Sequence, residues 1–252
     1  MACFVALTGV GTRLVARHFL FPTGGLARVE ARAERPVALV ARDGVPVHAL
    51  RFDGASRDGR VAVVFHGNRE TIEDNVELAG ELVTRGLSVM LVEYRGYGHS
   101  EAADPSEEGL YLDAEAALDH LAASGVADDR ITLVGRSLGT GVAAEMASRA
   151  RGTRLVLITP YTSIPDVVTD VMPILPARLL MPDHFDTLSK CARIRVPTLV
   201  IHGDRDEVVP FWMGERLVAS IAGARLLRVA GGRHGDLFGR SGLLDAIAGF
   251  AG

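Results

Sequence analysis

Short apolar runs, often β-branched, alternate along this chain with longer stretches of helical periodicity, and this alternation limits the possible folds most strongly. Two of the runs flank Asp43 and Gly44, a dipeptide typical of the turn in a β-hairpin. Apolar runs that alternate with helices are typical of a mostly parallel sheet whose helices cover both faces. The pattern therefore predicts an α/β fold with an antiparallel N-terminal hairpin. The other candidate strands span residues 61–66, 87–94, 131–134, 154–159, 197–202 and 224–230.

Two stretches carry the clearest helical signals. Between about 105 and 124, apolar residues recur at helical spacing, and Asp104 is expected to cap this helix with Glu107 completing a capping box. A second helix is predicted over about 71–85, where Gly86 ends the periodic pattern. Both stretches lie between candidate strands, so each is expected to pack against the sheet.

The domain organisation follows from what the sequence lacks. It shows no internal repeat, low-complexity linker or shift in composition that would mark a domain boundary. At 252 residues, 48% of them hydrophobic, the chain is long enough for one large core. We therefore expect a single α/β domain over residues 26–252, with a short cap at about 160–190.

Residues 1–25 are expected to form an N-terminal segment of different character, because the first twelve residues carry no charged side chain. Arg13 and Arg17 interrupt the apolar stretch well before the roughly 20 residues that a membrane-spanning helix needs. A signal peptide is disfavoured because no basic residue precedes the apolar stretch. Two alternatives stay open: the segment packs on the domain, or residues 1–21 contact a membrane peripherally. The expected location is cytoplasmic, with or without membrane association.

Charge and cysteine content exclude several classes of protein. The net charge is −4 at pH 7 and the arginines are scattered, so no basic surface for nucleic acid is indicated. Cys3 and Cys191 lie far apart without metal-ligand neighbours, which predicts neither a disulfide framework nor a zinc site. No metal or organic cofactor is expected, and the oligomeric state is left open.

The stretch ITLVGRSLGTG, residues 131–141, places Ser137 between a candidate strand and small residues that can begin a helix. In a nucleophile elbow the serine occupies a strained turn between strand and helix, and glycines two positions to either side avoid clashes. Gly135 and Gly139 occupy those positions. The pentapeptide alone is a weak signal in a chain with 28 glycines, but its context makes Ser137 a candidate nucleophile.

A serine nucleophile needs a base, and histidine is the usual one. His234 follows the last candidate strand in a glycine-rich loop, at the carboxyl edge where open α/β sheets gather catalytic groups. His66 and His202 each end a buried strand, so a structural or loop-orienting role is expected for both. His234 is therefore the candidate base. The other histidines lack a strand-end position: His18, His48, His99, His120 and His184.

A third group should orient the imidazole and stabilise its charged form. The segment IHGDRDEVVP, residues 201–210, offers Asp204, Asp206 and Glu207 directly after a candidate strand. Each of these carboxylates is also a common turn-forming or helix-capping group. The residues themselves leave the choice between Asp204 and Asp206 open.

The motifs resemble those of serine hydrolases with the α/β-hydrolase fold, and within that superfamily the small-lidded alpha/beta hydrolase domain-containing group. Eukaryotic members of this group often begin with a full membrane helix, which the N-terminal segment here is too short to match. Membrane residence is therefore not implied. The resemblance runs over most of the chain and includes VVFHGNRE, EYRGYGHSE, GRSLGTG, HGDRDEVVP and GGRHGD.

The resemblance implies a triad of Ser137, Asp206 and His234, in the chain order of this fold, with Asp206 rather than Asp204 as the orienting acid. It also matches the HGN sequence at 66–68 with a loop that supplies one oxyanion donor. The implied oxyanion hole consists of the backbone N–H groups of Asn68 and Leu138.

The function implied is hydrolysis of carboxylic esters with small or medium acyl chains, including lipid-like esters, through an acyl-enzyme. The alternatives are acyl-thioesterase or depalmitoylase activity, peptidase activity with the same triad, and a binding protein that has lost catalysis. Tyr94 and Tyr161 are expected to line the site, or else to support their loops. The apolar segment 160–196 predicts either a groove for an acyl chain or a crossover helix buried against the sheet.

Overall fold

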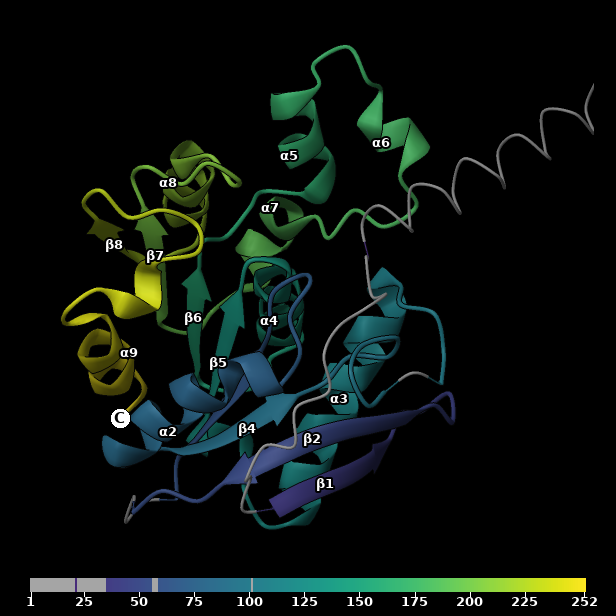
Figure 1. Cartoon of the computed structure of the whole chain (residues 1–252), viewed down its shortest axis with the longest axis vertical. Coiled ribbons are helices and arrows are strands. Elements are labelled where there is room, and N and C mark those ends of the chain that lie inside the picture. Colours follow the sequence, from purple (N-terminus) through teal and green to yellow (C-terminus); the bar gives the residue numbers. More distant parts are fainter. Residues whose placement is uncertain (1–20, 22–34, 56–58, 101) are drawn as a thin grey trace, which may run out of the picture.

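The structure, a computed structural model, describes residues 21, 35–55, 59–100 and 102–252. At its centre lies an eight-stranded sheet, counted over these residues, with the strand order β1-β2-β4-β3-β5-β6-β7-β8 (Figure 1). β1 and β2 form an antiparallel hairpin and β2 pairs antiparallel with β4, while all other neighbours are parallel. The predicted fold class, a mostly parallel α/β sheet that begins with an antiparallel hairpin, is confirmed.

The central strands are buried on both faces, which explains why they read as continuous apolar runs. All residues of β3, β4 and β7 are buried, and the limits of β3 to β8 fall within two residues of those predicted. The hairpin turns at Asp43 and Gly44 as expected, with Gly44 at φ 85°. The strands are β1 (Arg35–Val40), β2 (Pro46–Phe52), β3 (Val61–Phe65), β4 (Ser88–Val92), β5 (Ile131–Arg136), β6 (Arg154–Ile158), β7 (Thr198–Gly203) and β8 (Arg225–Val229).

Helices cover both faces of the sheet, as expected. One core cluster joins the sheet to α3, α4 and α8, and a second joins the opposite face to α2 and α9. Figure 1 shows α2 and α9 side by side, and Arg85 after α2 bonds to Asp245 of α9 at 2.7 Å. The main helices are α2 (Val76–Thr84), α3 (Glu107–Ala123), α4 (Leu138–Ser148), α8 (Phe211–Ser220) and α9 (Leu243–Ala251), and single 3-10 turns lie at Glu73–Asn75, Asp128–Arg130, Cys191–Arg193 and Leu237–Gly239.

The start of α3 differs from the prediction. Ser106 is the N-cap, and its side chain accepts a hydrogen bond from Gly109 N at 3.1 Å. The expectation that Asp104 caps the helix and that Glu107 completes a capping box is wrong. The Glu107 carboxylate instead accepts hydrogen bonds from the Tyr111 hydroxyl and from the backbone N–H of His184. The carboxylate thus bonds to a residue 77 positions away along the chain instead of capping its own helix.

Between β6 and β7 the chain forms three short helices, α5 (Ile164–Val171), α6 (Ala177–Leu180) and α7 (Thr187–Lys190). α7 packs on α4, whereas α5 and α6 pack on each other and stand beyond the carboxyl ends of β5 and β6 (Figure 1). We call Val171–Leu180 the cap tip. Four of its large apolar side chains are exposed, so the crossover-helix alternative does not describe them. These side chains are Val171, Met172, Ile174 and Leu179, between 55% and 98% exposed.

Of the N-terminal segment, Phe21 alone is described. Its side chain is 3% exposed, and its ring lies edge-on to Phe185 with centroids 6.2 Å apart. The two alternatives for residues 1–21 otherwise concern positions outside the described residues. Among the described helices, none combines the length and the apolar character that crossing a bilayer requires.

Candidate active site

Ser137 lies at the turn between β5 and α4, with φ 47° and ψ −116°. A positive φ is uncommon for a residue with a side chain and marks local strain that the surroundings must hold. Ser137 N donates to the Ile158 carbonyl at 2.9 Å, and Thr140 Oγ1 donates to the Ser137 carbonyl at 2.6 Å. The hydroxyl is thereby fixed at the carboxyl edge of a central strand.

The two flanking glycines are required because backbones approach closely on both sides of Ser137. A Cβ on Gly135 would lie 2.4 Å from the carbonyl oxygen of Gly139, and a Cβ on Gly139 would lie 2.1 Å from that of Phe65. Both obstacles are backbone atoms, so no change of rotamer could relieve the contacts. α4 consequently begins directly against the end of β3, next to the loop that follows it.

Three side chains far apart in sequence meet at this edge. His234 Nε2 lies 3.1 Å from Ser137 Oγ, and His234 Nδ1 lies 2.9 and 3.1 Å from the two carboxylate oxygens of Asp206. With Nδ1–H donating to the carboxylate, Nε2 keeps a lone pair that can accept the serine proton. The arrangement can therefore generate an alkoxide at Ser137 and hold the charged imidazole that results.

The surroundings of Asp206 stabilise its ionised form. Its side chain is 0% exposed, and burial alone would raise the carboxyl pKa. Hydrogen bonds from His202 and His234 and from the backbone N–H of Val209 outweigh burial and hold the pKa of Asp206 well below its usual range. Two of the stabilising donors are backbone groups: Val208 N and Val209 N donate to Oδ1 at 2.9 and 2.8 Å.

Asp204, the other candidate acid, does not contact the imidazole. Its carboxylate accepts hydrogen bonds from Arg228 at 2.8 and 3.0 Å and from Gly231 N at 2.7 Å. It therefore ties down the start of the loop that carries His234. Farther along this loop, Arg233 N donates to Asp236 at 2.8 Å.

The other strand-end histidines occupy buried positions away from the serine hydroxyl. His202 Nε2 donates to the Val209 carbonyl at 3.0 Å, and His66 Nδ1 donates to the Gly67 carbonyl at 2.8 Å. Both rings bond to the loop that follows their own strand, which is the loop-orienting role expected for them. His99 pairs with Glu73 at 2.8 Å.

The predicted oxyanion residues lie on the two segments that meet beside Ser137. Leu138 is the first residue of α4, where N–H groups have no intrahelical acceptor and point outward from the helix end. Asn68 lies in the loop after β3, and its side-chain oxygen accepts hydrogen bonds from the Tyr97 hydroxyl at 2.8 Å and from Arg69 N at 3.0 Å.

The loop that contains Asn68, residues 66–70, is tied to the elbow by a pair of charges. Gly67 N donates to Glu70 at 3.0 Å, and the same carboxylate pairs with Arg136 at 2.6 Å. Sequence reasoning missed Glu70, Arg136 and Tyr97 as supports of the site. The available signal was position: Arg136 lies inside GRSLG, and Glu70 follows HGN by two residues.

The expectation that Tyr94 and Tyr161 line the site needs correction. Tyr94 is 0% and Tyr161 1% exposed, so neither ring faces an open surface. The Tyr94 hydroxyl donates to the His66 carbonyl at 3.1 Å, and the Tyr161 hydroxyl donates to the Leu138 carbonyl at 2.9 Å. The two tyrosines support the backbones on either side of the site, which is the structural alternative.

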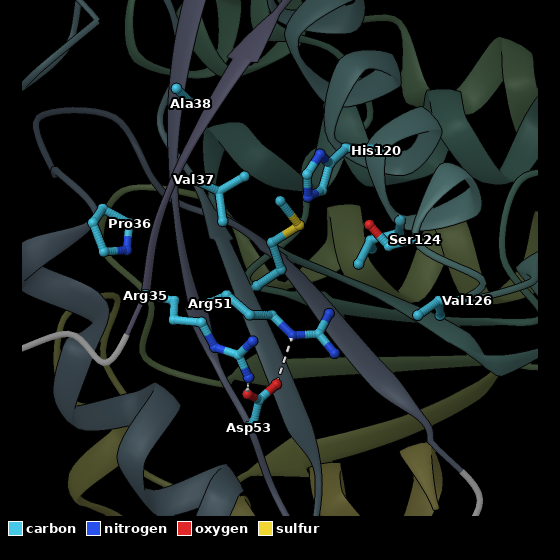
Figure 2. A pocket seen from close by; sticks show the side chains of 11 residues that line it. Arg35, Pro36, Val37, Ala38, Arg51, Asp53, His120, Ser124 and Val126 are labelled. Carbon is cyan, nitrogen blue, oxygen red and sulfur yellow. Dashed lines mark hydrogen bonds and ion pairs between the residues drawn. The ribbon is translucent and has the colours of Figure 1, made fainter.

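A hollow of about 550 Å³ lies elsewhere, between the β1–β2 hairpin and the C-terminal end of α3 (Figure 2). Arg35, Arg51 and Asp53 form one side of it, and His120 lies on α3 across from them. None of the predicted site residues lines this hollow. The triad lies instead at the carboxyl edge of the sheet, where Ser137 follows β5, Asp206 follows β7 and His234 follows β8.

Comparison with known proteins identifies the family of the chain. Residues 56–184 match the family described as serine aminopeptidase, S33. The protein Rv2307c of Mycobacterium tuberculosis, itself uncharacterized, is 38% identical over 243 residues, covering 93% of this chain and 86% of its own.

Two solved structures share the fold at low sequence identity. The esterase EaEST of Exiguobacterium antarcticum superposes with a TM-score of 0.70 at 20% identity, covering 85% of this chain and 98% of its own. The Pyrococcus furiosus esterase Pf2001 also reaches 0.70, at 17% identity, with coverage of 86% and 90%. The sheet order and the family match agree, and the chain belongs to the serine aminopeptidase S33 family of α/β hydrolases.

Proposed function

We propose that this protein is a serine esterase that cleaves carboxylic esters of small or medium acyl chains. The observation that carries the proposal is the continuous path from Ser137 Oγ through His234 to the buried Asp206, with contacts of 3.1 and 2.9 Å. A serine hydroxyl is a weak nucleophile on its own, and this arrangement is the one that activates it.

The proposed reaction is acyl transfer to water. His234 removes the Ser137 proton as Oγ attacks the ester carbonyl, and the carboxylate of Asp206 stabilises the imidazolium. His234 then protonates the leaving alcohol, which departs and leaves an acyl group on Ser137. A water molecule, deprotonated by His234, attacks this acyl-enzyme and releases the acid.

The oxyanion formed in both steps would be held by the backbone N–H groups of Asn68 and Leu138. Removal of one such donor lowers the rate about 10²- to 10³-fold in other enzymes. The proposal is supported by the position of Leu138 at the start of α4. It is also supported by the hydrogen bonds from Tyr97 to Asn68 and from Gly67 N to Glu70, which hold the loop that contains Asn68 in place. No metal or organic cofactor takes part in the proposed steps.

The substrate class is proposed from the cap. The segment between β6 and β7 contains only short helices and is too short to form a large lid domain. Its cap tip presents apolar side chains beside the carboxyl edge of the sheet. An apolar surface of this kind favours an acyl or alkyl group over a charged one. Small-molecule and lipid-like esters are therefore the proposed substrates.

Peptidase activity is a second candidate, favoured by the description of the matching family as serine aminopeptidase. The same triad attacks amides and thioesters, so the geometry of Ser137, His234 and Asp206 does not separate these reactions. The distinction between them lies in the leaving group and in what binds it.

A panel of soluble substrates tests the proposal. p-Nitrophenyl esters of increasing chain length, an acyl thioester and aminoacyl p-nitroanilides are compared for wild type and Ser137→Ala. We expect the highest kcat/KM on short or medium esters and no enzymatic turnover by Ser137→Ala. Turnover of the anilides alone would establish the peptidase instead, and absence of turnover on all three classes would indicate a binding protein.

A further inference from the structure

A buried pair of titratable side chains behind the site has no part in the proposed reaction. His66 is 1% and Glu93 0% exposed, and His66 Nε2 lies 3.4 Å from Glu93 Oε1. Within the described residues, His66 Nε2 and both oxygens of Glu93 make no other polar contact of hydrogen-bond length. A Cβ on Gly98 would lie 2.1 Å from Glu93 Oε2, so the carboxyl group is packed directly against backbone.

The hydrogen-bonding roles of His66 show that this pair holds a proton. Nδ1 faces the Gly67 carbonyl at 2.8 Å and must donate, because a carbonyl oxygen only accepts. If Nε2 carried no proton, its lone pair would face a bare carboxylate in a buried site, at a high cost in free energy. One proton is therefore shared between His66 and Glu93, and the pair is neutral as a whole.

The pair is enclosed by aromatic rings whose hydroxyl groups contact the loop that contains Asn68. The His66 ring lies 4.2 Å from the ring of Tyr94 and 5.3 Å from that of Tyr97, measured between centroids. The two tyrosine hydroxyls donate to the His66 carbonyl and to the side chain of Asn68. Any displacement of His66 would consequently displace the backbone that leads to Asn68.

We propose that Glu93 is a positioning residue that, through His66 and with Tyr97, fixes the loop 66–68 so that the Asn68 N–H meets the oxyanion. This inference rests on the proposed function. It adds to the site a histidine–carboxylate pair that orients a backbone donor rather than a base.

Other charges near the pair are few and already partnered. Glu70 is the other carboxylate that acts on His66, and it is neutralised by Arg136 at 2.6 Å. Burial alone would lower the pKa of His66, but Glu93, together with the Gly67 carbonyl and Glu70, outweighs burial and raises it. Burial raises the pKa values of Tyr94 and Tyr97. Loss of the proton from His66 is therefore displaced toward alkaline pH, where it would release the loop.

Two substitutions at Glu93 separate positioning from packing. Glu93→Met keeps the length of the side chain but leaves His66 Nε2 without a partner, so we expect kcat on a short p-nitrophenyl ester to fall about 10- to 100-fold, with KM little changed. Glu93→Gln can donate its amide N–H to neutral His66, so we expect activity within about threefold of wild type at neutral pH.

The pH profile provides an independent readout. Wild type should lose kcat at alkaline pH as the shared proton leaves, whereas Glu93→Gln has no such proton and should keep its activity there. If Glu93→Met does not fold, Tyr97→Phe provides the kinetic test, since it removes one hydroxyl and should lower kcat about 3- to 10-fold through Asn68. Melting curves and circular dichroism show that each variant is folded.

The outcomes separate this proposal from the proposed function. Activity in wild type that is absent in Ser137→Ala supports the esterase mechanism, whatever the Glu93 variants do. With that established, kcat of folded Glu93→Met within twofold of wild type would overturn the positioning role. An alkaline loss in Glu93→Gln identical to that of wild type would overturn it equally.

Discussion

Replacement of Asp206 by asparagine tests the chemistry of the site with almost no change of shape. In the structure Oδ1 accepts the N–H groups of Val208 and Val209, while Oδ2 lies 2.9 Å from His234 Nδ1. In Asp206→Asn the amide oxygen must take the place of Oδ1, because backbone donors need an acceptor. The NH₂ group then faces His234 and forces Nδ1 to accept.

The consequence is the wrong tautomer of the base. His234 Nε2 would carry the hydrogen and present a donor to Ser137 Oγ, so it could no longer remove the serine proton. In serine hydrolases with this triad the same change lowers kcat about 10⁴-fold. That loss corresponds to about 5.4 kcal/mol of transition-state stabilisation.

Asp204→Asn is the matched control, since Asp204 precedes Asp206 by two residues and bonds to Arg228 and Gly231 N instead. Steady-state hydrolysis of a p-nitrophenyl ester is measured for both variants, together with their melting temperatures. We expect Asp204→Asn to keep kcat within about tenfold of wild type. A folded Asp206→Asn with nearly wild-type kcat would refute the reasoning, as would equal losses in the two variants.

Three further predictions concern packing, a thiol and acid stability. Gly139→Ala should lower the melting temperature by about 10 °C or prevent folding, because overpacking against the Phe65 carbonyl costs about 3 kcal/mol. Gly80→Ala is the control: the new Cβ would meet no neighbouring atom within 4 Å, so the variant should be neutral or stabilising. Burial raises the pKa of the Cys191 thiol to about 11, so alkylation at pH 7.5 mapped by mass spectrometry should leave Cys191 unmodified in the folded protein, and rapid modification would contradict this. Folding lowers the pKa of Asp206, so the contribution of its carboxylate to stability is complete above about pH 4 and is lost as the pH falls through the folded pKa. The difference in melting temperature between wild type and Asp206→Asn should therefore change below about pH 4. A difference that does not depend on pH would contradict this prediction.

The strands could be predicted because their signal is local. A central strand buried on both faces reads as an unbroken apolar run, and β3 and β7 are found within a residue of their predicted limits. The elbow could also be predicted, because the close approach of backbones at Gly139 requires glycine at a fixed spacing from Ser137. Both signals are properties of a few consecutive residues.

What could not be predicted depends on contacts between distant segments. The Glu107 carboxylate accepts a hydrogen bond from the backbone N–H of His184, so it does not complete a capping box with Asp104. The helix begins with Ser106 as its N-cap instead. Asp204 and Asp206 are equivalent in local sequence, and the difference between them is that the second lies against His234.

The two site tyrosines illustrate the same limit. The sequence predicts that Tyr94 and Tyr161 line the site, because Tyr94 belongs to the EYRGYG motif at the end of one candidate strand and Tyr161 lies just past another. Their hydroxyls bond to buried backbone instead. The strand-end position of a residue can be predicted from sequence, but not whether its side chain turns into the core or toward substrate.

The most direct test of the central claim is to identify the residue that carries the acyl group. The protein is mixed with an excess of a p-nitrophenyl ester, quenched in acid during turnover, digested, and analysed by mass spectrometry. We predict an acyl adduct on Ser137 of the wild-type protein and no acyl adduct in Ser137→Ala. An acyl adduct on a different residue, or activity retained in folded Ser137→Ala, would contradict the account.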